Sequence, residues 1–192
     1  DGTRAFAAAV KAGNVALAKS LYDKTRWHWE AIEPVAESFG DLDPILDARE
    51  GDLEPGTPWT GWHALEKQLW VTGLDANSTA LADQLVADTE DLVTRISTVK
   101  LTISQMANGA KELMDEVATG KVTGEEERYS RTDLWDFDAN VAGALQVVEV
   151  TRSLLETNDP DLLTEIDATF GALKAELAKH QVGSGFKLYN QL

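Results

Sequence analysis

The segment GWHALE, residues 61–66, places His63 and Glu66 three positions apart in a chain with only three histidines. On an α-helix, residues three apart share one face, with Cβ atoms about 5–6 Å apart. An imidazole nitrogen and a carboxylate oxygen at that separation can bind one metal ion. The same spacing is typical of a solvated helical ion pair worth about 0.3–0.5 kcal/mol, and spacing alone favours that simpler interpretation.

Further carboxylates have spacings that could serve the same chemistry. Glu30 and Glu33 repeat the three-residue spacing in HWEAIEP, and a facing helix with such a pair can supply two more ligands. The pattern alone favours a charged outer face. The segment GEEERYSRTDLWDFD adds six carboxylates, including Glu126, which is more than an inert connection needs. Helix capping by Thr132 or Asp133 explains part of this surplus.

The other two histidines are given structural roles. His28 lies between Trp27 and Trp29 at a position that matches the apolar phase of its helix, so we expect it to be buried. His180 falls in the last turn of a predicted helix, where a partial positive charge is favourable.

The charge and composition of the chain exclude several classes of protein. Acidic residues outnumber basic ones 33 to 17, for a net charge of −16, and no basic stripe appears. Nucleic-acid binding is therefore not expected, because it requires clustered Lys and Arg. There is no cysteine, so any metal must be held by His and by oxygen ligands, which favour iron and other hard cations. No run of about 20 apolar residues predicts insertion into a membrane.

The periodicity of apolar residues is helical nearly throughout, which predicts an all-α, mostly antiparallel helical bundle. We expect one domain over residues 1–192, with an N-terminal half (1–100) that carries the His63–Glu66 pair and a C-terminal half (101–192). Expected helices include 15–39, interrupted at Pro34, and one after residue 104 that Ser104 caps. Residues 41–58, rich in proline and acidic residues, are expected to form a surface loop.

Three segments, HWEAIEPVAESFGDLDPILDAREGD, WTGWHALEKQLW and GEEERYSRTDLWDFDAN, occur in this order across most of the chain. Together they strongly resemble the imelysin-like family, in particular its iron-uptake components of the EfeO type. The family pattern G-x-H-x-x-E is met by Gly61, His63 and Glu66. By comparison with the family, the chain starts within the first helix and stops where members continue into another helix, so we expect the bundle to be truncated at both ends.

The resemblance implies a helical bundle exported to the periplasm or cell surface, often with a lipid anchor. It implies binding of iron, as Fe²⁺ or Fe³⁺, with Zn²⁺ or Cu²⁺ as alternatives, for delivery to a membrane permease, with a peroxidase of the same system as a further partner. It implies that His63 and Glu66 form the metal site. The residues that could complete it are Glu30, Glu33, Asp83 and Glu126.

Two alternatives remain open. One is a metallopeptidase, which the family's historical label suggests. However, the chain has no HExxH motif, and Glu66 cannot easily act as both ligand and base, so an enzyme is not expected. The other is a module that binds a polysaccharide or polyanion on six tryptophans. Burial of these rings in the bundle explains them more simply.

Overall fold

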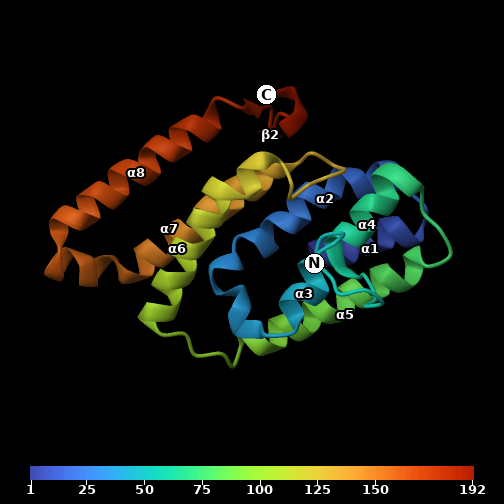
Figure 1. Ribbon diagram of the computed structural model, residues 1–192, viewed down its shortest axis with the longest axis horizontal. Helices are drawn as coiled ribbons and strands as arrows, with labels where there is room; N and C mark the ends of the chain where they lie inside the picture. Colours follow the sequence, from blue (N-terminus) through green and yellow to red (C-terminus); the bar gives the residue numbers. More distant parts are fainter. The chain divides into compact units, whose positions relative to one another are not determined.

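The computed structural model describes residues 1–192, which are helical nearly throughout (Figure 1). The prediction of an all-α bundle is confirmed. None of the helices combines the length and the apolar character that crossing a membrane requires. The chain divides into two compact units. The first consists of Asp1–Arg26, Ala36–Lys100 and Glu126–Ser130, and the second of Trp27–Val35, Leu101–Glu125 and Arg131–Leu192.

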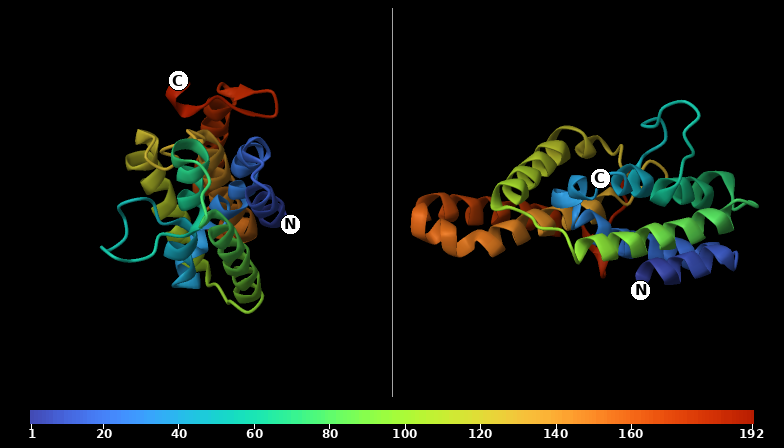
Figure 2. Two further views of the ribbon diagram at one scale, coloured as in Figure 1. Left: turned by 90° about the vertical axis from the view of Figure 1, so that its right-hand side faces the viewer. Right: turned by 90° about the horizontal axis from the view of Figure 1, so that it is seen from below.

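The first unit is built around two helices, α1 (Gly2–Lys11) and α5 (Ser78–Ile96). Figures 1 and 2 show α1 lying along α5. α1 buries an alanine-rich face that includes Phe6, and α5 buries a stripe that contains Leu81, Leu85 and Leu92. This period-3.6 stripe is what holds an amphipathic helix against its neighbour.

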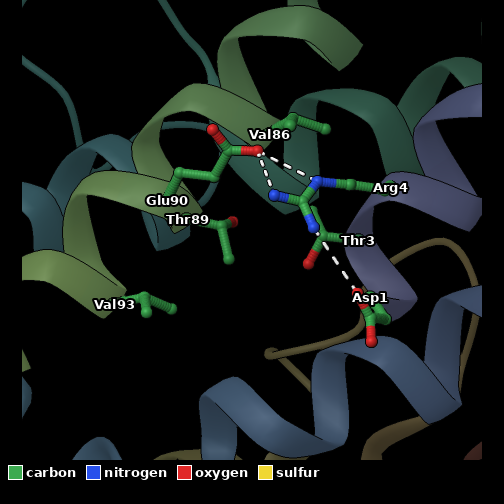
Figure 3. Close-up of a pocket in the computed structure, with 7 residues that line it drawn as sticks. All are labelled: Asp1, Thr3, Arg4, Val86, Thr89, Glu90 and Val93. Carbon is green, nitrogen blue, oxygen red and sulfur yellow. Dashed lines mark hydrogen bonds and ion pairs between the residues drawn. The ribbon is translucent and has the colours of Figure 1, made fainter.

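An ion pair links the two helices at the surface. Arg4 Nη2 of α1 lies 2.7 Å from Glu90 Oε1 of α5, at a hollow of about 450 Å³ that Val86 and Val93 also line (Figure 3). Both charged side chains are more than half exposed, so the pair contributes little to stability. The hollow contains no histidine and none of the predicted metal ligands.

Aromatic packing fixes the helix that carries the motif. α2 (Val15–Glu30) places Tyr22 against Trp62 of α4 (Gly61–Lys67), with ring centroids 6.2 Å apart. Phe6 lies 5.5 Å from the same Trp62 ring. Both of these partners are fully buried. Such clusters supply large apolar burial with specific ring geometry, so α4 is held in one orientation. A π-helical turn, Gln68–Thr72, continues α4.

Three local expectations are corrected. The helix expected over 15–39 ends at Glu30, and Glu33–Phe39 is a 3-10 helix, because Pro34 disfavours α-helical geometry before it and lacks an N–H. The expected loop 41–58 contains a short helix, α3 (Leu42–Asp47), whose leucines at positions 42 and 46 are buried. His28 is exposed instead of buried.

The second unit contains three longer helices, α6 (Ile103–Thr119), α7 (Asp133–Asn158) and α8 (Pro160–Ala178). α7 packs against both of the others, and the single residue Asp159 separates it from the antiparallel α8. Asp159 Oδ1 accepts the N–H of Leu162 and caps α8, with Pro160 in its first turn. The core includes Leu134, Phe137, Val141 and Leu177.

Two details of the second unit differ from expectation. Thr102, and not Ser104, caps α6, in a capping box with Gln105. The C-terminal tail forms a two-stranded antiparallel hairpin, which the all-helical expectation did not include. Its strands are β1 (Gln181–Val182) and β2 (Gly185–Phe186). Phe186 packs edge-on against Trp135 of α7.

Candidate metal centre

The start of α4 lies against the end of α3 through a glycine that no other residue can replace without strain. Gly61 has φ +80°, and a Cβ at this position would lie 2.1 Å from the carbonyl oxygen of Leu46. Thr60 Oγ1 donates a hydrogen bond to the carbonyl of Ile45 at 2.9 Å. The first turn of α4 is thereby directed toward Asp47, the last residue of α3.

The pair that the sequence singled out is buried. His63 is 1% exposed and Glu66 is 0% exposed, so the pair is not a solvated helical ion pair. His63 Nδ1 lies 3.2 Å from Glu66 Oε2. On its other side, His63 Nε2 is 3.5 Å from Asp47 Oδ1 and 3.6 Å from Glu126 Oε1, and it makes no hydrogen bond.

Two groups of potential ligands share His63. One consists of Asp47, His63 and Glu126, and the other of His63, Glu66 and Glu127. Within each group, one ligand atom from every residue lies within 4.8 Å of the others. These residues come from α3, from α4 and from the segment Glu126–Ser130, all parts of the first unit. One imidazole and several carboxylates form a donor set that suits iron and related cations.

The segment Glu126–Ser130 is held on α4 by its backbone. Glu66 Oε1 accepts the N–H groups of Tyr129 at 2.8 Å and Ser130 at 2.7 Å. Ser130 Oγ donates to Glu127 Oε2 at 2.5 Å. Glu66 is therefore fixed through one oxygen by the backbone and through the other by His63, a support that orients a ligand in advance.

Two arginines neutralise part of the carboxylate charge. Arg26 of α2 is fully buried, and its guanidinium contacts Asp47, Glu126 and Glu127. Its Nη2 is 2.9 Å from Glu126 Oε1, and its Nε is 2.6 Å from Glu127 Oε1. Arg49 reaches the other oxygen of Glu126, with Nη1 to Oε2 at 2.9 Å. Buried carboxylates at these separations need such charge compensation.

The electrostatics of the site shift three pKa values. Burial and the Arg26 charge lower the pKa of His63, but the carboxylates of Glu126, Glu66 and Asp47 outweigh them and raise it to about 10. Burial opposes ionisation of Glu66, yet its bonds to His63 and the Ser130 backbone hold its pKa below the usual range. Burial and the nearby Glu66 charge raise the pKa of Glu127 well above normal.

Of the predicted ligands, the structure brings Glu66 and Glu126 each close to His63, but in different groups, Glu66 on the side of Nδ1 and Glu126 on the side of Nε2. Asp83 belongs to neither group and is exposed on α5, where its Oδ1 lies 2.5 Å from Lys11 Nζ. This ion pair gives Asp83 another role, so we leave it out of the ligand set.

Glu30 and Glu33 lie in the second unit and belong to neither group. The ammonium group of Lys121, itself fully buried, lies 3.0 Å from Glu30 Oε2 and 2.7 Å from Glu33 Oε2. Asn140 Nδ2 donates to the same two oxygens, at 2.9 and 2.7 Å. The lysine ammonium group thus occupies the position between these two carboxylates that a metal ion would need.

Three residues of the site were missed from the sequence: Asp47, Glu127 and Arg26. Asp47 lies in a segment that was expected to be loop, and Glu127 was only one member of an acidic run. A signal for Arg26 was available. It lies eight positions after Ala18 and four after Tyr22, on the same helical face, and this face is buried.

The sequence is similar to proteins of one known family. The model of the imelysin family (Peptidase_M75) matches residues 1–191. The chain is 47% identical to the "Iron uptake system component EfeO" of Yersinia pseudotuberculosis serotype I (strain IP32953) and 45% identical to the protein of that name from Escherichia coli O157:H7, over 99% of this chain and 52% of each relative. It thus spans about half the length of these relatives. With most of its length matched by the family model, the chain belongs to the imelysin family.

Proposed function

We propose that this chain binds an iron ion at the cluster around His63 and serves as the ion-binding part of an extracytoplasmic iron-uptake system. The observation that carries the proposal is a buried histidine that belongs to two groups of carboxylates at once. The relatives named as iron-uptake components add independent support.

The proposed ligands are His63 with one of two carboxylate pairs, either Asp47 and Glu126 on the side of Nε2 or Glu66 and Glu127 on the side of Nδ1. The imidazole would bind through a nitrogen in its neutral form, and the carboxylates would provide hard oxygen donors. His63 Nε2, which is buried and makes no hydrogen bond, is the donor atom best placed for this. The excess of negative charge favours iron, with Zn²⁺ and Cu²⁺ as competing ions.

As a working model, the ion is handed on to a membrane permease outside the cytoplasm, with a peroxidase as a further partner. The support is the name of the relatives, "Iron uptake system component EfeO". The ligands belong to a transport site, so the bound iron is cargo and must be able to leave.

We propose no enzymatic activity, although the family model carries a peptidase name. A hydrolytic metal site needs a water and a carboxylate free to act as a base. Here both oxygens of Glu66 are engaged, one by the Tyr129 and Ser130 N–H groups and the other by His63. Zinc-loaded protein is expected to leave a broad peptide library uncleaved, and cleavage that is lost in His63→Ala would contradict this.

The alternative of a polymer-binding module has little support from the tryptophans. All six are buried or half-buried, and Trp29 and Trp62 are only 4% and 2% exposed. Stacking platforms for a sugar or a polyanion must present a ring face to solvent. We infer that these rings serve the core.

The proposal is tested by calorimetric titration with Fe²⁺ under anaerobic conditions, with chelated Fe³⁺, and with Zn²⁺. Wild-type protein should bind these ions. The affinity of the double variant His63→Ala/Glu66→Ala should be lower by at least about tenfold, because removing direct ligands costs no less than removing the groups that support them. His28→Ala is the matched control, because this histidine is exposed and lies in the second unit. An affinity of the double variant equal to that of wild type would show that His63 and Glu66 do not form the metal site.

A further inference from the structure

Arg26 occupies an unusual position for a charged residue. Its side chain is 0% exposed, and each of its three nitrogen atoms approaches a different carboxylate, those of Asp47, Glu126 and Glu127. These are the three carboxylates that, with Glu66, surround His63 in the two ligand groups. The guanidinium therefore contacts both groups at once.

A guanidinium in this place is a permanent unit charge. Arginine does not lose its proton in proteins, so Arg26 carries +1 whether or not a metal is bound. Buried carboxylates at contact distance repel one another strongly unless a cation lies among them. Arg26 is a cation in this position that stays charged at every pH, and it contacts three of these carboxylates.

We propose that Arg26 is the built-in counter-ion of the metal centre, and that it sets how strongly, and with what charge preference, the site binds cations; this rests on the proposed function. An incoming ion must take over carboxylate oxygens that the guanidinium holds, Glu126 Oε1 above all, since the same oxygen faces His63 Nε2. The positive charge of Arg26 also opposes the ion directly. Arg26 therefore keeps affinity low enough for release.

The charge of Arg26 should affect divalent and trivalent ions to different extents. Removing Arg26 makes the site more negative by one unit. The Coulomb attraction grows in proportion to the charge of the bound ion, so a trivalent ion should gain more affinity than a divalent one. A residue that only positioned the ligands would give the opposite result, because its loss would lower the affinity of the site for both ions alike.

Arg49 offers a matched control within the same site. It contacts Glu126 Oε2, yet its side chain is 22% exposed, so solvent screens its charge. Arg26→Gln and Arg49→Gln remove the same unit charge from two environments. Arg26→Lys keeps the charge but loses the planar fork that contacts several carboxylates.

The experiment measures affinity for Zn²⁺ and for Ga³⁺ by competition with a chelator at one fixed pH. We expect Arg26→Gln to tighten Zn²⁺ binding at least about tenfold and Ga³⁺ binding by more, Arg49→Gln to change either by less than about threefold, and Arg26→Lys to stay near wild type. Unchanged or weaker Zn²⁺ binding in Arg26→Gln, or equal behaviour of the Lys and Gln variants, would overturn the inference.

A second outcome is that Arg26→Gln does not fold without metal, because loss of the arginine charge leaves buried carboxylates uncompensated. The inference then expects Zn²⁺ added during refolding to restore the helical circular dichroism, and failure of Zn²⁺ to do so counts against it. Failure of the proposed function has a different signature. In that case wild-type protein binds neither ion, or His63→Ala/Glu66→Ala binds them as well as wild type does.

Discussion

Glu66 Oε1 accepts the backbone N–H of Ser130 at 2.7 Å, although 64 positions separate the two residues in the chain. The other oxygen of Glu66 faces His63 Nδ1 at 3.2 Å. One buried carboxylate thus joins the histidine of α4 to the segment that carries Glu126 and Glu127. Its charge and its hydrogen bonds have separate, measurable consequences.

Replacing Glu66 by glutamine keeps the size of the side chain and removes its charge. The amide oxygen can still accept from Tyr129 and Ser130, but its NH₂ group then faces His63. We expect the free energy of unfolding to fall by about 1.5–3 kcal/mol, the range for hydrogen bonds to charged groups, and metal affinity to fall at least tenfold. Urea unfolding and calorimetry measure the two effects. Glu165→Gln, at an exposed position of α8, should change neither.

Metal binding should release a proton. The pKa of His63 is raised to about 10 by the surrounding carboxylates, so the imidazole is protonated at pH 7 in metal-free protein. A metal can bind its nitrogen only after that proton leaves. We expect about one proton per bound ion from His63, and affinity that rises up to tenfold per pH unit below 10.

Titration in buffers of different ionisation enthalpy gives the number of protons released. Glu127, whose pKa is also raised, adds a second proton if it binds the ion in its charged form. His63→Asn serves as the comparison, because the His63 proton is then absent. A wild-type stoichiometry of zero protons would show that His63 is not a ligand.

The stability of the metal-free protein should depend on the same group. The pKa of His63 is raised from 6.5 to about 10 on folding, so its imidazolium stabilises the folded state fully below pH 6.5 and loses this effect as pH rises through 10. The free energy of unfolding is expected to fall between these pH values by more in wild type than in His63→Gln. Equal pH profiles for the two proteins would contradict the prediction.

Gly61→Ala should disturb the junction of α3 and α4. Its φ of +80° and the 2.1 Å approach of a Cβ to the Leu46 carbonyl combine backbone strain with a steric clash. Gly73→Ala is the control, because its φ is +83° but nothing lies within 4 Å of the added carbon. We expect Gly73→Ala to cost about 1–3 kcal/mol in thermal or urea unfolding, and Gly61→Ala to cost clearly more and to weaken metal binding.

Lys121→Met should destabilise the protein without reducing metal stoichiometry. It would leave Glu30 and Glu33 without the buried ammonium group that lies between them, which typically costs about 3–5 kcal/mol. Lys111→Met removes an exposed ion pair with Asp115 and should cost less than about 1 kcal/mol. Metal stoichiometry that falls in Lys121→Met would instead tie Glu30 and Glu33 to the ion.

The sequence was most informative where chemistry depends on local spacing. His63 and Glu66 are neighbours on one turn, so a helix alone brings them together, and the structure adds that both are buried. Helices such as α8 follow from apolar periodicity with Pro160 at the start. The prediction of a single domain over 1–192 remains a prediction.

Partners that are distant in the chain could not be found in this way. Nothing local distinguishes Glu33, which lies beside Lys121, from Glu126, which lies beside His63. Both are glutamates in acidic surroundings, and their roles depend on which side chain tertiary folding brings to them. Asp47 was missed for a related reason, since two buried leucines form a helix too short to show a clear period.

The placement of Glu126–Ser130 within the first unit has a consequence for the order of events during synthesis. The residues on both sides of it, Leu101–Glu125 and Arg131–Leu192, belong to the second unit. A nascent chain that has emerged only as far as Lys100 holds His63, Glu66 and Asp47 but lacks both Glu126 and Glu127. Closing the contact from Glu66 to Ser130 is a non-local step, and such steps come late and slowly in folding. The cluster around His63 can therefore form only after the chain has been synthesised as far as Ser130.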